Sequence, residues 1–341
     1  MSAQPLVVAG AGLVSSVGLN APAACAAIRA GLTNPIETRF MSLGGEWITA
    51  HAVPLDRPLA GREKLASMAA MVIDECLRDV PAPERAQIPL LLCVAERSRA
   101  GRIGGLDDKL FIEIRELADT PFSPQSLIVS QGRVGAVSAL MQARKLLYQD
   151  DAAAVLIVGV DSLLNGPTLS ALDKQARLLV TGNSNGFLPG EGAAGILVKR
   201  ADRSTGLHIE GLGFGMETAH IDATEPLRAE GLSLAIKGAL ADAGKQMHDM
   251  DLRITDLSGE QYYFKEAALA LSRTLRQRKG ELDIWHPAEC IGEAGSMIGP
   301  AMLAVAEAAC SKGYADGPSI LIHAANDTGE RAAIVARYEV Y

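Results

Sequence analysis

The chain has 341 residues, of which 48% are hydrophobic and 21% charged, and its net charge is −8 with no basic run. This composition is typical of a globular protein with room for two core-forming lobes, and it argues against a nucleic-acid groove or an anionic membrane surface as a partner. The five cysteines are scattered without a C-x-x-C pair, so we expect reduced thiols and neither a disulfide framework nor a metal site.

The first residues, MSAQPLVVAGAGLV, lack a basic stretch followed by a long apolar core, and no run of 18 apolar residues occurs in the sequence. We therefore expect a cytoplasmic protein with no membrane span.

Apolar periodicity predicts a regular alternation of strands and helices through residues 1–200. The predicted strands are Leu6–Ala9, Glu46–Ala52, Ile88–Ala95, Ser126–Ser130, Ala153–Val158 and Ala193–Lys199. The predicted helices are Ala21–Ala30, Arg62–Arg78, Asp107–Leu117, a helix after Gly132, and Thr168–Leu179. This alternation is typical of β-α-β units.

Residues 201–341 repeat the plan in a shorter form. The predicted strands are Leu207–Leu212, Leu252–Leu257, Asp283–Trp285, Ser319–Ala324 and Ala332–Glu339, and the predicted helices are Glu225–Ala243, Glu260–Arg278 and Gly295–Lys312. We expect a duplicated α/β fold of mostly parallel, buried strands. Only a short charged turn, KRADRST, separates residues 1–200 from 201–341, so the two halves are expected to share one layered core.

A strand-turn-helix elbow is predicted where the strand Ser126–Ser130 passes through Gln131 and Gly132 into a helix. Unpaired backbone N–H groups and the positive end of the helix dipole converge at such a point. Enzymes often place a nucleophile there, but this chain has Arg133. Its guanidinium stays protonated, so it serves as neither nucleophile nor base.

The glycines that follow the first strand suggest a dinucleotide motif, because Gly10-Ala11-Gly12 comes between a strand and a helix. The third glycine of that motif is missing, since position 15 is Ser15. We interpret the stretch as a turn packed beneath the sheet and predict no cofactor.

The stretch GFLPGEGAAGILVK, residues 186–199, resembles the Gly-Phe-x-x-Gly-Glu-Gly-Ala-Gly stretch of β-ketoacyl synthases. The stretches VVAGAGLVSSVG, DDAAAVLIVGVDS and CIGEAGSMIGPAMLAVA are similar to other segments of these condensing enzymes of fatty-acid and polyketide synthesis. The resemblance covers most of the chain. It implies a thiolase-like α/β fold, with duplicated halves in a layered α-β-α-β-α sandwich.

The family's catalytic residues are not present at the places that the resemblance assigns to them. Counting back from Asp161 puts the nucleophilic cysteine's place at Arg133, and the two histidines correspond to Ser258 and Glu293. The family's lysine corresponds to Ala288. Because condensation needs a thiolate and two imidazoles, the resemblance implies a degenerate site that does not condense acyl groups.

Arg133 suggests a structural role for these substitutions. A cation at a helix N-terminus is disfavoured by the dipole by about 0.3–1 kcal/mol, so an anion nearby is expected. We hypothesise that Arg133 pairs with Glu293 and that Ser258 and Glu260 are hydrogen-bonded around the pair. The alternative is that Arg133 binds the carboxylate or phosphate of an acyl or phosphopantetheine-like ligand.

Three more residues are candidates for the same pocket. Gln131 is considered because decarboxylating relatives carry Gln at the cysteine's place. Cys290 is considered as a relocated nucleophile, although a lone Cys among apolar neighbours is usually buried and inert. Asn326 precedes the closing loop, in which Asp327–Arg331 lack the family's phenylalanine.

The sequence is compatible with two functions. The first is a non-catalytic subunit similar to chain length factors, dimeric through the strand Ser126–Ser130 and bound to itself, to a synthase or to a secretion-system protein. The second is an acyltransferase or decarboxylase that acts on acyl thioesters or on an acyl carrier protein.

Overall fold

A computed structural model describes residues 4–341. One ten-stranded mixed sheet dominates it, in the order β10-β9-β11-β12-β8-β1-β7-β6-β4-β5. Its strands are β1 (Leu6–Val14), β4 (Leu90–Cys93), β5 (Leu127–Val129), β6 (Val155–Ser162), β7 (Glu191–Arg200), β8 (Gly206–Met216), β9 (Leu252–Thr255), β10 (Asp283–Trp285), β11 (Ser319–Ala325) and β12 (Glu330–Glu339). A separate hairpin joins β2 (Ile36–Met41) and β3 (Trp47–Ala50).

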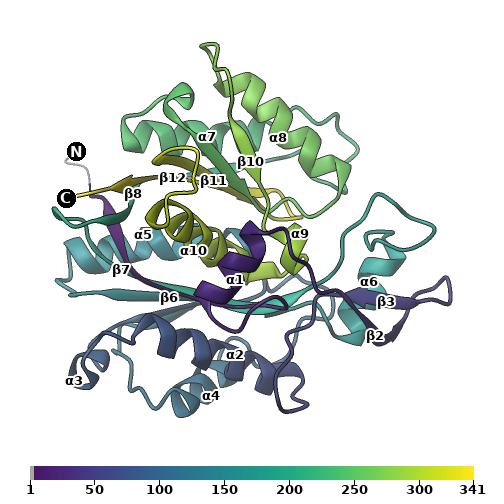
Figure 1. Ribbon diagram of the computed structural model, residues 1–341. Helices are drawn as coiled ribbons and strands as arrows, with labels where there is room; N and C mark the ends of the chain where they lie inside the picture. Colours follow the sequence, from purple (N-terminus) through teal and green to yellow (C-terminus); the bar gives the residue numbers. More distant parts are fainter. Residues whose placement is uncertain (1–3) are drawn as a thin grey trace.

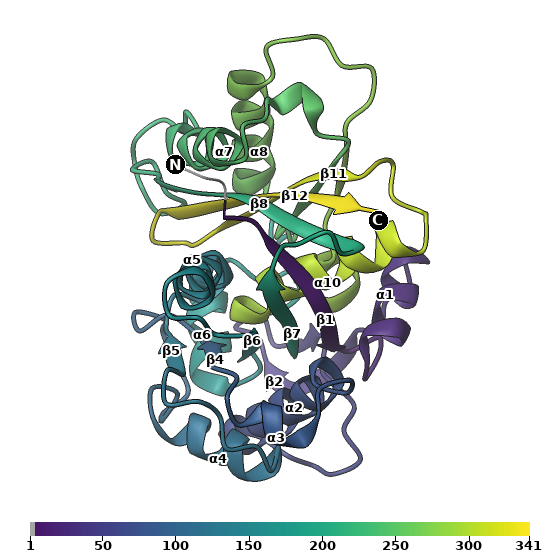
Figure 2. The same cartoon turned by 90° about the vertical axis from the view of Figure 1, so that its left-hand side faces the viewer.

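The sheet is built from two half-sheets with the same strand order. In each half, the first strand lies next to the fifth, followed outward by the fourth, the second and the third. The halves join where β1 pairs with β8, at Leu6 with Ile209 and Val7 with His208. Figure 2 shows β1 between β7 and β8 at this junction. The predicted duplication is therefore present, while the domain boundary at residue 200 stays a prediction.

Helices and half-sheets alternate in five layers (Figure 1). The middle layer contains α5 (Gly135–Tyr148) and α10 (Ile298–Ser311), with α1 (Ala21–Arg29) and α9 (Ala288–Ile291) beside them. One outer layer contains α2 (Gly61–Cys76), α3 (Ala82–Arg85) and α4 (Lys109–Leu117), and the other contains α7 (Glu230–Ala243) and α8 (Gln261–Thr274). The helix α6 (Gly166–Lys174) lies beside the β2–β3 hairpin.

The largest core cluster fills the middle layer. It joins side chains of α5 and α10 to residues of both half-sheets, such as Ile157 of β6 and Ile334 of β12. Because α5 and α10 are covered on both sides, ten of the fourteen residues of α10 are buried. Burial of apolar surface on this scale is the dominant stabilising term in the fold.

Two sequence predictions about the sheet are wrong. The strands are not mostly parallel, because the central pairs β11–β12, β12–β8, β8–β1, β1–β7 and β7–β6 are antiparallel. The glycines Gly10 and Gly12 do not form a turn but continue β1 to Val14. A Cβ at either glycine would lie 2.8 Å from a carbonyl oxygen of α2, so these glycines let the helix approach the strand.

Several element boundaries also differ from the predictions. The helix α7 begins at Glu230, five residues later than expected, and α6 ends at Lys174. The elements β2, α3 and α9 were not predicted; all three are short, and α3 and α9 have only four residues each. Elements of this length show too little periodicity to be recognised in a sequence.

Candidate functional site

Arg133 lies at the elbow that the sequence predicts. After β5, the 3₁₀ turn η1 (Gly132–Val134) leads directly into α5. Gly132 has φ of +55°, and a Cβ there would clash with Glu96 Oε2, so glycine suits this position for both reasons. The turn directs the Arg133 side chain inward, where the residue is only 7% exposed.

A group of acidic and phenolic side chains surrounds the Arg133 guanidinium. Nη1 donates a hydrogen bond to Glu293 Oε2 at 3.0 Å, and Nη2 donates to Tyr263 Oη at 3.1 Å and to the Asp327 carboxylate. Asp256 Oδ2 lies 3.8 Å from Nε. The predicted Arg133–Glu293 pair is therefore confirmed.

A second arginine, Arg177, shares one of these carboxylates. It donates two hydrogen bonds to Glu260, at 2.5 and 2.7 Å, and two to Asp327, at 2.9 and 3.2 Å. Asp327 thus bridges Arg133 and Arg177. Burial opposes ionisation of Asp327, but the two guanidinium charges outweigh it and hold the pKa of Asp327 well below its usual range. Glu260 belongs to the network through Arg177, and not beside Arg133 and Glu293 as expected.

Asn326 fixes the backbone of the elbow. Its Oδ1 accepts from Arg133 N at 3.1 Å, and its Nδ2 donates to Gln131 O at 3.0 Å. The Gln131 side chain is exposed and accepts a hydrogen bond from Ser138. Gln131 therefore contributes its backbone to the site, while its side chain points elsewhere.

Asp161 links a third arginine, Arg99, to a second elbow in the C-terminal half, and Glu293 Oε1 accepts a hydrogen bond from Gly295 N of the same elbow at 3.0 Å. Arg99 donates to Asp161 at 2.7 Å and makes two hydrogen bonds to Glu96. Asp161 also accepts from Ser296 N at 2.9 Å, and Ser296 is the middle residue of the 3₁₀ turn η3 (Gly295–Met297).

The arginines and carboxylates line a cavity of about 190 Å³. Arg99, Arg133 and Arg177 each have at least one carboxylate partner within 3.0 Å. Buried charges are stable only when they are paired and hydrogen-bonded in this way. Because Nη1 and Nη2 of Arg133 both already donate to protein acceptors, the arrangement favours the structural pair over an anion receptor.

Asp256 has a different environment from Asp327. It accepts from Ala325 N at 2.8 Å, but Arg133 is 3.8 Å away. Burial raises the pKa of Asp256 to about 7, against the smaller lowering effect of Arg133. Asp256 is thus the carboxyl group of the network that changes charge near neutral pH.

Two predicted site residues lie outside the network. Among the described residues, no hydrogen-bond partner is found for the buried Ser258 Oγ, so the prediction that Ser258 joins the Arg133–Glu293 pair is wrong. Cys290 Sγ lies 4.0 Å from Ile28 O, beside α1. Gly292, with φ of +74°, turns the chain after α9, so that Glu293 enters the network and Cys290 does not.

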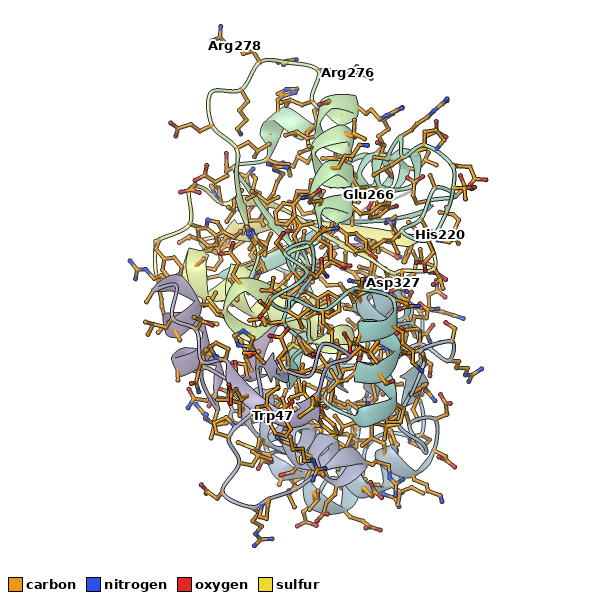
Figure 3. The ribbon with its side chains drawn as sticks, turned by 90° about the vertical axis from the view of Figure 1, so that its right-hand side faces the viewer. Trp47, His220, Glu266, Arg276, Arg278 and Asp327 are labelled. Atoms are coloured by element: carbon orange, nitrogen blue, oxygen red, sulfur yellow. The ribbon has the colours of Figure 1, made fainter. Side chains whose placement is uncertain are left out.

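Sequence reasoning did not identify five residues of the network: Arg99, Arg177, Asp256, Tyr263 and Asp327. Only two of them gave a signal. Tyr262, Tyr263 and Phe264 are too close in sequence to share one helix face, and Tyr263 is the one that turns inward, with 5% exposure. Asp327 belongs to the closing loop, which the sequence showed to be altered. Figure 3 shows Asp327 near the middle of the molecule.

Residues 4–341 contain no cluster of His, Cys, Asp and Glu arranged to hold a metal ion. Within the same residues, no helix combines the length and hydropathy needed to span a membrane.

Compared with protein-family models and with curated proteins, the sequence gives no match. Solved structures do resemble it. The ishigamide ketosynthase/chain length factor matches with a TM-score of 0.78 at 15% identity, over 99% of this chain and 100% of that one. A ketosynthase in complex with its chain length factor from Xenorhabdus doucetiae matches with a TM-score of 0.79 at 11% identity, over 98% of both chains.

A β-ketoacyl synthase from Burkholderia phymatum matches with a TM-score of 0.76 at 15% identity, over 99% of this chain and 100% of that one. These similarities cover 98–99% of the chain, and the predicted fold class is confirmed. The chain has the thiolase-like α/β fold of these ketosynthase and chain-length-factor structures.

Proposed function

We propose that the chain is a non-condensing, ketosynthase-like protein that acts by binding a partner protein, in the manner of a chain length factor. The observation that supports this most strongly is the occupied elbow. Where a condensing enzyme needs a free thiolate, this chain has Arg133, and its side chain is tied to Glu293, Asp327 and Tyr263. A guanidinium held by carboxylates supplies no nucleophile.

None of the five cysteines is suited to replace the missing nucleophile. Cys93 lies close to the elbow, in β4, but it is fully buried, and burial raises the pKa of its thiol to about 12. Burial also raises the pKa of Cys290. Reactive cysteines instead combine a lowered pKa with access to solvent.

The open edge of β5 supports partner binding. Among the described strands, β5 pairs only with β4. The nearby surface exposes apolar side chains on α5 and β8, namely Met141 at 46%, Phe214 at 41% and Met216 at 56%. An open edge with apolar neighbours favours association, and two-fold symmetry is the most common form. We propose that a second copy, or a ketosynthase, binds here.

Two measurements test this function. The protein is incubated with a malonyl thioester, free and on an acyl carrier protein, and examined by intact mass spectrometry; we expect no adduct. A stoichiometric adduct on any cysteine would overturn the proposal. Analytical ultracentrifugation of Ile128→Asp should show loss of the dimer or of the ketosynthase complex, whereas Ile112→Asp, on the exposed face of α4, should not.

An acyltransferase or decarboxylase is the second candidate. A decarboxylase would use Gln131, but the exposed Gln131 side chain bonds to Ser138 and not to the elbow cavity. Release of CO₂ from the malonyl thioester, lost in Gln131→Ala, would establish this second function in place of the first.

A further inference from the structure

The strand order places an open edge at each end of the ten-stranded sheet. The end strands β5 and β10 are the third strands of their half-sheets, and each has three residues. Among the described strands, β10 pairs only with β9. Its outer edge therefore presents backbone N–H and C=O groups that can pair with another extended chain.

An aromatic cleft of about 390 Å³ adjoins the end of β10. Its floor contains Ile28 of α1 and Val305 of α10, and Trp285 stacks against Tyr314 with ring centroids 6.2 Å apart. Phe264, which is 40% exposed, lies edge-on to His286, one of the lining residues, with ring centroids 5.6 Å apart. Aromatic residues make up only 4% of the chain, so their gathering here is unusual.

Two charged side chains, Arg29 and Glu289, line the cleft, and Glu289 lies against His286. The Arg29 guanidinium lies over the Tyr314 ring, 4.2 Å from the centroid. Among residues 4–341, no carboxylate pairs with Arg29, in contrast to the three arginines of the elbow network. An arginine stacked on an aromatic ring keeps its N–H groups available for a carboxylate.

A loop of residues 275–282 leads into β10 from the other side. Arg276 and Arg278 are exposed there and point away from the body of the molecule (Figure 3). The strand itself starts with the exposed Asp283 and ends at the cleft. Arg276 and Arg278 lie beyond one end of β10 together with the exposed Glu281, and Arg29 and Glu289 lie beyond the other.

We propose that the edge of β10 and the aromatic cleft bind an extended segment of a partner protein as an eleventh strand. Backbone pairing with β10 supplies affinity, and the cleft supplies specificity by taking one aromatic side chain of the segment. A carboxylate directly after that side chain binds Arg29. Since three strand residues span about 10 Å, five or six residues of the partner make the contact. A small ligand would use the cleft but leave the β10 edge unpaired.

This inference is independent of the proposed function, because β5 and β10 lie at opposite ends of the sheet. The segment binds whether or not the protein condenses acyl groups or dimerises through β5. Loss of one binding surface leaves the other intact, so the two can be tested separately.

The probe is a fluorescein-labelled hexapeptide, Thr-Val-Thr-Val-Phe-Asp, amidated at its C-terminus. Three control peptides are compared with it. One has Asn in place of Asp, one has Ala in place of Phe, and one is methylated on alternate backbone nitrogens. Binding is measured by fluorescence anisotropy. We expect saturable binding of the first peptide, at least tenfold weaker binding of the Ala and N-methyl peptides, and weaker binding of the Asn peptide.

Protein variants locate the site. Arg29→Gln should weaken binding of the Asp peptide about fivefold and leave binding of the Asn peptide unchanged. A purely structural role of Arg29 would not produce this difference. Trp47→Phe leaves Trp285 as the only tryptophan, so peptide binding should change the emission of this variant. Trp47 lies on the separate β2–β3 hairpin, 49% exposed, and its replacement should not alter affinity.

Three results would overturn the inference. They are the absence of saturable binding by all four peptides, equal affinity for the N-methyl peptide, and equal discrimination between the Asp and Asn peptides by wild type and Arg29→Gln. Ultracentrifugation of Arg29→Gln should match wild type, which separates failure at β10 from failure of the proposed association through β5.

Discussion

The two halves contain matching elbows with different contents. In the first, Gly132 has φ of +55° and opens η1 before the 14-residue helix α5; in the second, Gly295 has φ of +58° and opens η3 before the 14-residue helix α10. The middle residue is Arg133 in one turn and Ser296 in the other. The backbone is thus repeated, while the side chain at its centre is not.

The surroundings explain why a charge is tolerated in only one elbow. Three separate segments place Glu293, Asp256 and Asp327 around the Arg133 guanidinium. Ser296 is fully buried, and its hydroxyl reaches the carbonyl oxygens of Val160 at 3.0 Å and Cys93 at 3.3 Å. A buried charge depends on long-range partners, whereas a hydroxyl needs only a neighbouring carbonyl.

The largest effect is expected at the first elbow. Arg133→Leu leaves buried carboxylates without their cation and should lower the free energy of unfolding by about 3–5 kcal/mol. Chemical denaturation at neutral pH measures the loss. Arg62→Leu is the control, because the Arg62–Glu113 pair is about one-third exposed and exposed ion pairs contribute little to stability. Equal losses in the two variants would contradict a special role for the Arg133 network.

The second-largest effect is expected at the contact between the helices α5 and α10. A Cβ at Gly299 of α10 would overlap the Cβ of Ala136 on α5, whereas one at Gly135 would lie 3.6 Å from its nearest neighbour. Gly299→Ala should therefore destabilise the protein by about 1–3 kcal/mol. Gly135→Ala, in a helical conformation, should be neutral or stabilise by up to about 1 kcal/mol. Thermal unfolding of both variants checks the difference, and similar Tm values would exclude close packing at Gly299.

The pH dependence of stability tests Asp256. Its pKa rises from 3.8 to about 7 on folding, mainly through burial, so the folded protein holds an extra proton between these values. The resulting stabilisation is complete below about pH 4 and is lost as the pH rises through about 7. Relative to Asp256→Asn, wild type should lose about 1.4 kcal/mol per pH unit between about pH 5 and 6. Parallel stability curves for the two proteins would show that Asp256 ionises normally.

The smallest effect is expected at the second elbow. Ser296→Ala removes one buried hydroxyl and should cost about 0.5–1.5 kcal/mol, the usual net value of a hydrogen bond. Urea denaturation should distinguish it from Ser272→Ala, which removes an exposed hydroxyl of α8 and should be close to neutral. A loss comparable to that of Arg133→Leu would mean that the two elbows are equally critical.

Most of the fold could be predicted because its long elements are strongly periodic. The helix predicted at Gly295–Lys312 is observed as η3 and α10, which together cover Gly295–Ser311, and β11 differs from its prediction by one residue. The antiparallel centre of the sheet was missed, since strand direction depends on how distant segments meet. The length of β1 was missed because its glycines are typical of a turn, and only the packing of α2 explains them.

The central pair of the candidate site, Arg133 and Glu293, could be predicted from the sequence, but the residues around it could not. A cation at a helix N-terminus is stabilised by a nearby anion, and this local argument was enough to pair Arg133 with Glu293. Arg177 lies 150 positions from Asp327 in the sequence, and no local pattern indicates such a contact. Ser258 was placed in the network by resemblance alone, and the structure leaves it outside.

The position of β1 also affects the order in which the protein is assembled. The strand β1 is synthesised before both of its neighbours and must wait for them, because Leu6 pairs with Arg200 of β7 and Ile209 of β8. Pairing across such a sequence separation is slow, since a long loop must close before the contacts form. The junction between the two half-sheets therefore cannot close until Ile209 has emerged, and β1 is inserted late.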